Sequence, residues 1–165
     1  MRREDRMKLL FETKSEYTYD EYLKFSRTVQ NKVQRLWLLQ LAMVAAFLVL
    51  AWLGWKKGST VEAIAGIIVA VLITVIFYLV NSWVIKRLYQ SNHALQGQVS
   101  TFRFYRDHFE QDNALGHTSI PYDELTEIVE TKTNFYLMVD KNQGMILIKE
   151  NCTPELTAFV QNLKK

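Results

Sequence analysis

The sequence predicts a membrane α+β protein, in which a hairpin of two transmembrane helices is joined to a small antiparallel β domain. Two observations predict this class. Residues 36–55 and 61–85 hold most of the Ala, Val, Ile and Leu, while the flanking segments carry nearly all the charge. After residue 97 the pattern changes to short runs of β type. Mean hydropathy is only -0.06 because it averages over these two unlike parts.

The N-terminal part, residues 1–35, is predicted to be a cytoplasmic strand followed by a juxtamembrane helix. The strand is expected at Lys8–Thr13. Thr18 and Glu21 then have capping-box spacing and open a helix with apolar residues at helical intervals. We expect this helix to run straight into the membrane or to bend only at its surface.

The hairpin is predicted over residues 36–85. Its first span, Leu36–Trp55, has Gln40 as its only clearly polar residue. Twenty residues at about 1.5 Å each reach roughly 30 Å, the thickness of the hydrocarbon core of a bilayer. The second span, 61–85, has an apolar core between residues 63 and 80. The alternative is a pair of buried helices in a soluble bundle, but neither segment shows amphipathic periodicity.

The connection between the spans has five residues, 56–60, and therefore requires an antiparallel pair. Ser59 and Glu62 have capping-box spacing at the start of the second helix. Gly58 can adopt the positive φ that ends the first helix. Small residues that permit close helix contact recur at helical spacing, and they are Ala42, Ala46, Gly66 and Ala70.

Gln40 is expected to make an interfacial hydrogen bond rather than to line an ion pathway. It lies within about one turn of the end of its span. Asn81 and Ser82 lie toward the same face of the membrane and are its expected partners.

Basic residues near the ends of the spans predict the orientation. Six precede the first span or follow the second, and the loop has only Lys56 and Lys57, so the positive-inside rule places both termini in the cytoplasm. The six residues are also candidates for contact with anionic lipid headgroups, although ordinary topology determinants have the same composition. They are Lys24, Arg27, Lys32, Arg35, Lys86 and Arg87.

The C-terminal part, residues 99–165, is predicted to be a small barrel or strongly bent sheet of five or six strands. Turn-rich segments at 112–117 and 140–144 indicate two β-hairpins. Thr153 as N-cap and Pro154 at the first helical position predict a closing amphipathic helix. The strands are expected at 99–105, 108–111, 118–121, 126–131, 135–139 and 145–149.

The first of these hairpins carries the most concentrated set of polar side chains. If Asp112 pairs with His117, then His108, Glu110, Asp112 and His117 all project from one face. Two imidazoles and two carboxylates are a possible ligand set for a divalent cation. The alternative, which we favour, is the solvated face of a hairpin whose other face points into the core. No cofactor is predicted.

Other chemistry finds little support in the sequence. A net charge of +3 argues against nucleic acid. No serine lies in a nucleophile elbow, and the six glycines form no phosphate-binding loop. Cys152 is the single cysteine and is expected to be a mildly reactive or half-buried thiol rather than a catalytic one. His93 has no assignable partner. The sequence therefore does not predict an enzyme.

The chain resembles the YcxB-like family of small bacterial membrane proteins. The resemblance lies in the order of the parts and in loose motifs, with Ile148 standing where the family tends to have proline. It implies that the soluble part is similar to pleckstrin-homology-like domains, which bind lipids, peptides or proteins. The matching segments are Thr18–Tyr22, Ile120–Leu125, Ile128–Thr131, Asn134–Leu137 and Ile146–Lys149.

These features predict a membrane-anchored cytoplasmic interaction or regulatory module in the plasma membrane. Its expected partners are the lipid bilayer and a cytoplasmic or membrane protein. The alternative is a membrane-embedded immunity or transporter-accessory protein that acts through its transmembrane hairpin. The oligomeric state is left open.

Overall fold

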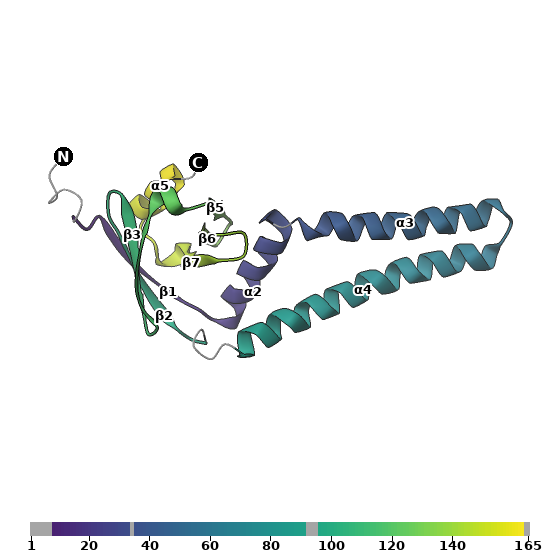
Figure 1. Ribbon diagram of the computed structural model, residues 1–165, viewed down its shortest axis with the longest axis horizontal. Coiled ribbons are helices and arrows are strands. Elements are labelled where there is room, and N and C mark those ends of the chain that lie inside the picture. Colours follow the sequence, from purple (N-terminus) through teal and green to yellow (C-terminus); the bar gives the residue numbers. More distant parts are fainter. Residues whose placement is uncertain (1–7, 34, 92–95, 164–165) are drawn as a thin grey trace. The chain divides into compact units, whose positions relative to one another are not determined.

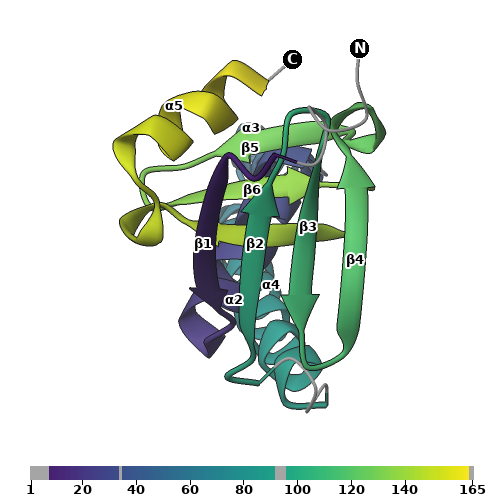
Figure 2. The ribbon, with the colours of Figure 1, turned by 90° about the vertical axis from the view of Figure 1, so that its left-hand side faces the viewer.

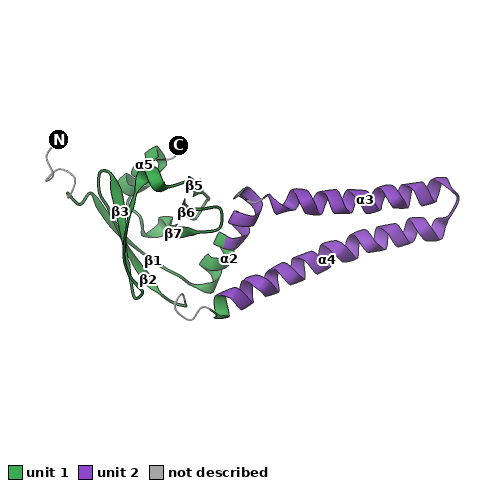
Figure 3. Ribbon diagram, viewed as in Figure 1, with its two compact units in different colours: residues 1–25, 89–165 green, residues 26–88 purple. Residues whose placement is uncertain are grey.

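A computed structural model describes residues 8–33, 35–91 and 96–163, and it divides the chain into two compact units (Figure 3). Unit 1 combines residues 1–25 with residues 89–165, and unit 2 comprises residues 26–88. The sequence-based division at residues 35, 85 and 99 differs from these bounds. The difference arises because the N-terminal strand folds with the C-terminal part of the chain.

Unit 1 contains two antiparallel sheets rather than a closed barrel. The first sheet has four strands in the order β1-β2-β3-β4, and Figure 2 shows them side by side. The second has three strands in the order β5-β6-β7, which run across the direction of the first. The strands are β1 Phe11–Glu16, β2 Val99–Phe104, β3 His108–Asn113, β4 Gly116–Pro121, β5 Glu127–Glu130, β6 Asn134–Met138 and β7 Gly144–Ile148.

One apolar core lies between the sheets and the C-terminal helix α5, Pro154–Leu163. Strand alternation directs Phe104, Phe109 and Leu147 into this core, where none has exposed surface. As the sequence predicted, Thr153 caps α5, because its hydroxyl accepts a hydrogen bond from the Leu156 amide at 3.2 Å. Short 3₁₀ turns, Tyr122–Glu124 and Lys149–Asn151, connect β4 to β5 and β7 to α5.

Strand β1 lies three residues further along the chain than the predicted Lys8–Thr13. It pairs in antiparallel register with β2. Its inward-facing side chains are Thr13 and Ser15, which are 5% and 1% exposed. The Thr13 hydroxyl donates to the Asn151 carbonyl at 2.6 Å, and the Ser15 hydroxyl accepts from the Ile148 amide at 3.1 Å. The hydrophobic pattern placed the strand too early because hydroxyl groups, not apolar side chains, fill its inward face.

Unit 2 contains two helices that are long and apolar enough to cross a membrane, α3 (Leu36–Lys56) and α4 (Thr60–Ser91). Helix α4 is six residues longer at its C-terminal end than the predicted span. The preceding helix, α2 (Tyr19–Thr28), does not run straight into α3. A π-helical turn at Val29–Val33 follows it, and Arg35 has a left-handed backbone with φ 53°. This break excludes the straight helix, and a bent helix was the other expectation.

The turn of the hairpin has the predicted chemistry. The Ser59 hydroxyl accepts from the Glu62 amide at 3.4 Å, and Gly58 has φ 78°. Helix contact near this turn depends on Gly54 and Gly66. A Cβ atom at Gly66 would lie 2.8 Å from that of Ala51, and one at Gly54 would lie 2.8 Å from that of Glu62. The prediction for Ala42 and Ala46 was wrong, because both are exposed.

Helices α3 and α4 diverge away from the turn (Figure 1). At the diverging end, Asn81 of α4 bonds Gln30 of the π-helical turn rather than Gln40. The two side-chain amides exchange hydrogen bonds of 2.8 and 2.6 Å. The sequence therefore identified Asn81 correctly as a hydrogen-bonding residue but assigned it the wrong glutamine.

Candidate functional site

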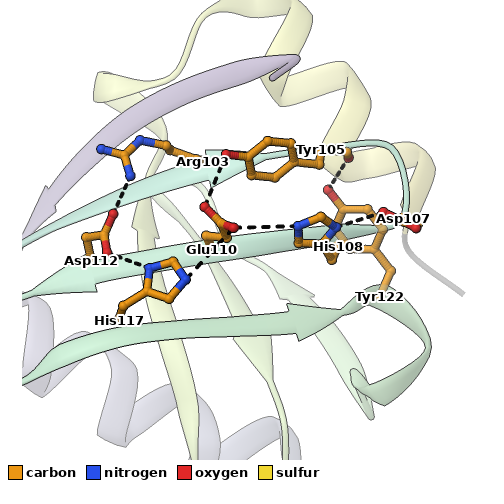
Figure 4. Close-up of polar contacts among 8 residues, drawn as sticks. All are labelled: Arg103, Tyr105, Asp107, His108, Glu110, Asp112, His117 and Tyr122. Atoms are coloured by element: carbon orange, nitrogen blue, oxygen red, sulfur yellow. Dashed lines mark hydrogen bonds and ion pairs between the residues drawn. The ribbon is translucent and has the colours of Figure 1, made fainter. Parts of the chain in front are cut away.

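The outer surface of β2, β3 and β4 carries the polar cluster that the sequence singled out (Figure 4). The predicted register is confirmed, because Asp112 lies opposite His117. Phe109 and Ile120 are buried on the other side of these strands. We call this surface the polar face. It consists of Glu12, Arg103, Tyr105, Asp107, His108, Glu110, Asp112 and His117.

Asp112 lies within a chain of ion pairs that runs from His117 to Glu12. Its carboxylate accepts from Arg103, and it lies 2.6 Å from His117 Nδ1. Arg103 in turn donates from Nε to Glu12 at 3.0 Å, which joins β1 to the cluster. The hydrogen bond from His117, followed by the Arg103 guanidinium, lowers the pKa of the Asp112 carboxyl. Asp112 therefore stays ionised at neutral pH.

Glu110 is at the centre of the polar face. The Tyr105 hydroxyl donates to its Oε2 at 3.1 Å, and its Oε1 lies 3.8 Å from Nε2 of both His108 and His117. Asp107 lies 2.7 Å from His108 Nδ1, and the Tyr105 ring stacks on the His108 ring at 4.6 Å. Partial burial of Tyr105, and then the Glu110 carboxylate, raise the pKa of the Tyr105 hydroxyl.

The polar face does not form a metal centre as its side chains are placed. Within residues 8–33, 35–91 and 96–163, no group of three His, Cys, Asp or Glu side chains is arranged to hold a metal ion. Both His Nδ1 atoms face aspartates, and both Nε2 atoms are too far from Glu110 for a hydrogen bond. The arrangement fits a solvated network of ion pairs with four carboxylates and one guanidinium.

A cavity of about 740 Å³ opens beside His108, at the edge of the polar face. One wall contains Tyr122, whose hydroxyl donates to the Tyr105 carbonyl at 2.8 Å. Its amide donates to the Asp107 carbonyl at 3.1 Å, so the 3₁₀ turn after β4 holds this wall in place. The lining residues are Asp107, His108, Ser119, Pro121, Tyr122, Asp123, Asn162 and Leu163.

The six basic residues near the predicted spans are not equivalent in the structure. Lys24 belongs to unit 1, and its ammonium group lies 2.6 Å from Asp20 and 2.8 Å from Glu21. These carboxylates raise the pKa of Lys24. In unit 2, Arg27 lies over the Tyr78 ring and Arg87 over the Trp83 ring. The other three, Lys32, Arg35 and Lys86, are exposed and also belong to unit 2.

Cys152 has the half-buried position expected of it. Its Sγ atom donates to the Ile148 carbonyl at 3.3 Å, and burial raises the pKa of the thiol. The raised pKa disfavours the reactive thiolate. His93, Lys164 and Lys165 lie outside the described residues.

The sequence did not reveal how α2 docks on the second sheet. Asn134 of β6 has no exposed surface, and its amide donates to the Glu21 carboxylate. Phe25 packs edge-on against Tyr136 at 5.3 Å, and the Tyr17 hydroxyl accepts from the Ile146 amide at 3.1 Å. The predicted capping bond from the Glu21 amide to Thr18 is present at 3.3 Å. A capping-box glutamate gives no sign of a second, long-range partner.

Tyr89, near the C-terminal end of α4, completes this docking region in unit 1. Its hydroxyl donates to the Tyr17 carbonyl at 3.1 Å, and its ring lies 5.5 Å from the rings of both Tyr19 and Tyr22. Within unit 1, residues that precede the hairpin in the chain therefore contact a residue that follows it.

Comparison with known proteins gives one match. The model of the family described as YcxB-like protein matches residues 104–163, which run from the end of β2 to the end of α5. This match is narrower than the resemblance inferred from the sequence, since it leaves out β1 and both long apolar helices. The search of curated proteins and the search of solved structures gave no match. The family match supports the predicted resemblance: residues 104–163 of this chain are similar to the family described as YcxB-like protein.

Proposed function

We propose that the protein is a membrane-anchored cytoplasmic module that binds another protein through the polar face and the adjoining cavity. The α3–α4 hairpin is its anchor in the plasma membrane, with both termini in the cytoplasm. Most large apolar side chains of the two helices are exposed, including Leu39, Leu50 and Ile76 at more than half of their surface. Such a surface is suited to an apolar solvent and supports insertion into a bilayer.

The docking of α2 on β6 is the observation that carries this proposal. The Asn134 amide is buried against Glu21, and Phe25, the residue just before unit 2 begins, contacts Tyr136. A simple anchor needs only a flexible linker. The built contact ties the β domain to the segment that precedes the hairpin in the chain.

The charge of the polar face indicates the chemistry of the partner. Four carboxylates face solvent there with one guanidinium between them. Complementary potentials favour specific encounters and suppress unsuitable partners. We therefore expect a partner that presents a basic segment to β3 and β4 and inserts a side chain into the cavity beside His108.

Site-specific photocrosslinking in membranes tests this proposal. A photoreactive residue at Ser119, which lines the cavity, should capture a discrete protein, whereas one at the exposed Glu127 of the other sheet should not. Glu110→Lys should abolish the crosslinked product formed from position 119, which we call the Ser119 product, because this substitution reverses the central charge of the polar face. Equal products from both positions, or a product unaffected by Glu110→Lys, would exclude this surface as the binding site.

Replacing residues 36–85 with an unrelated two-helix hairpin tests the alternative, in which the apolar helices are the working surface. Retention of the Ser119 product supports the proposed module. Its loss, with the chimera still in the membrane fraction, would favour action through the native hairpin.

A further inference from the structure

A cavity of about 560 Å³ lies inside unit 2, where α3 and α4 diverge. Rise along a helix of about 1.5 Å per residue places Tyr78 roughly 27 Å from Thr60 at the turn. If the turn lies at one surface of the bilayer, Tyr78 is near the opposite boundary of the hydrocarbon core. The cavity is therefore at the depth where lipid headgroups meet acyl chains.

The headgroup end of the cavity is polar and cationic. Arg27 lines it and lies 3.4 Å from the Tyr78 hydroxyl, with its guanidinium 5.9 Å from the centre of that ring. The paired amides of Gln30 and Asn81 form the neighbouring wall. An arginine held at this position presents N–H donors whose geometry suits a phosphate group.

The lining of the cavity also includes apolar side chains, Val75, Phe77 and Leu79, beside the polar Gln40 and Thr74. Phe77 and Asn81 also belong to a second, adjoining groove of about 410 Å³. Apart from Asn81, the groove is lined by aliphatic and aromatic side chains, among them Ile73, Ile76 and Val80. The cavity and the groove together match an amphiphilic molecule, because Arg27 provides a cationic site and the groove provides an apolar channel beside it.

The charge of unit 2 favours an anionic occupant over a second copy of the chain. Among residues 26–88 the only acidic residue is Glu62, next to the turn. The opposite end carries Arg27, Lys32, Arg35, Lys86 and Arg87. A second copy inserted there would bring like charges together, and this is unfavourable. An anionic lipid would neutralise them.

We propose that the diverging end of the hairpin binds one anionic glycerophospholipid. Its phosphate contacts Arg27 between Tyr78 and the Gln30–Asn81 pair, and one acyl chain lies in the groove beside Phe77. This inference rests on the proposed insertion of the hairpin into a membrane. It assigns Arg27 a specific role that the other basic residues of unit 2 do not share.

Native mass spectrometry of the full chain tests this inference, after extraction from membranes that contain phosphatidylcholine and phosphatidylglycerol. The wild-type protein should retain one phosphatidylglycerol. Arg27→Gln should lower the retained fraction by about tenfold, equivalent to about 1.4 kcal/mol. Arg27→Lys should retain part of the binding. Arg87→Gln is the matched control, since it removes the same charge from a residue outside the cavity, and should have little effect.

Equal losses in Arg27→Gln and Arg87→Gln would overturn the inference, because they would show only a diffuse attraction to anionic lipid. A lipid-free dimer would overturn it in favour of a second copy. Displacement of the lipid by millimolar inorganic phosphate alone would identify an anion site that does not need the acyl chain. If the wild-type chain is absent from the membrane fraction, the proposed function fails as well; if it is present without lipid, only this inference fails.

Discussion

Tyr136→Ala is expected to destabilise unit 1 by about 3–5 kcal/mol and to release α2 from the second sheet. Tyr136 is 1% exposed and lies on the face of β6 that α2 covers. Its ring contacts Phe25 at 5.3 Å, and its hydroxyl accepts from the Asn134 amide at 3.3 Å. Truncation would leave a cavity the size of an aromatic ring and remove a partner from a buried amide.

Hydrogen exchange and urea unfolding of the full chain in detergent would measure this effect. In Tyr136→Ala, the backbone amides of α2 should lose their protection from hydrogen exchange. In the matched variant Tyr136→Phe, which keeps the ring, the loss of stability should be only about 1 kcal/mol. Unchanged protection of α2 in Tyr136→Ala would show that this helix is not held by β6.

Leu156→Ala is expected to destabilise the β domain by about 2–5 kcal/mol. Leu156 is 1% exposed and, together with Val160, forms the face of α5 that closes the core. The core is small. Few neighbouring side chains could therefore move to fill a cavity left beneath α5. Asn162→Ala, on the exposed side of the same helix, should change stability by less than about 0.5 kcal/mol.

Urea unfolding of the full chain in detergent, followed by hydrogen exchange of the unit 1 amides, would compare the two α5 variants. A cost below about 1 kcal/mol for Leu156→Ala, or equal costs at Leu156 and Asn162, would contradict the role of α5 as the cover of the core.

Local chemistry made much of the fold predictable from the sequence. Ser59 and Thr153 are caps because a hydroxyl one residue before a helix satisfies a free amide, and this requires no tertiary information. The pairing of Asp112 with His117 followed from a short turn between two alternating strands. This one register was sufficient to place the four polar side chains of the hairpin on a common face.

Long-range pairing was much less predictable. Strand β1 joins β2 across more than eighty intervening residues, and its buried side chains, Thr13 and Ser15, resemble those of a surface loop. Glu21 gave a clear local signal as a capping residue, but its contact with Asn134 depends on how α2 packs on β6. The positions at which α3 and α4 touch, Ala51 and Gly66, depend on the angle between the helices, which small-residue spacing does not determine.

Residue-specific thiol labelling would test the central claim of a cytoplasmic β domain anchored by a membrane hairpin most directly. In a Cys152→Ser background, Lys57→Cys places a thiol in the turn after α3, and Lys141→Cys places one in the exposed turn after β6. We predict that a membrane-impermeant maleimide labels Lys57→Cys in intact bacterial cells but labels Lys141→Cys only after permeabilisation, with both proteins resistant to alkaline carbonate extraction. Release of the chain by carbonate, or labelling of Lys141→Cys in intact cells, would contradict it.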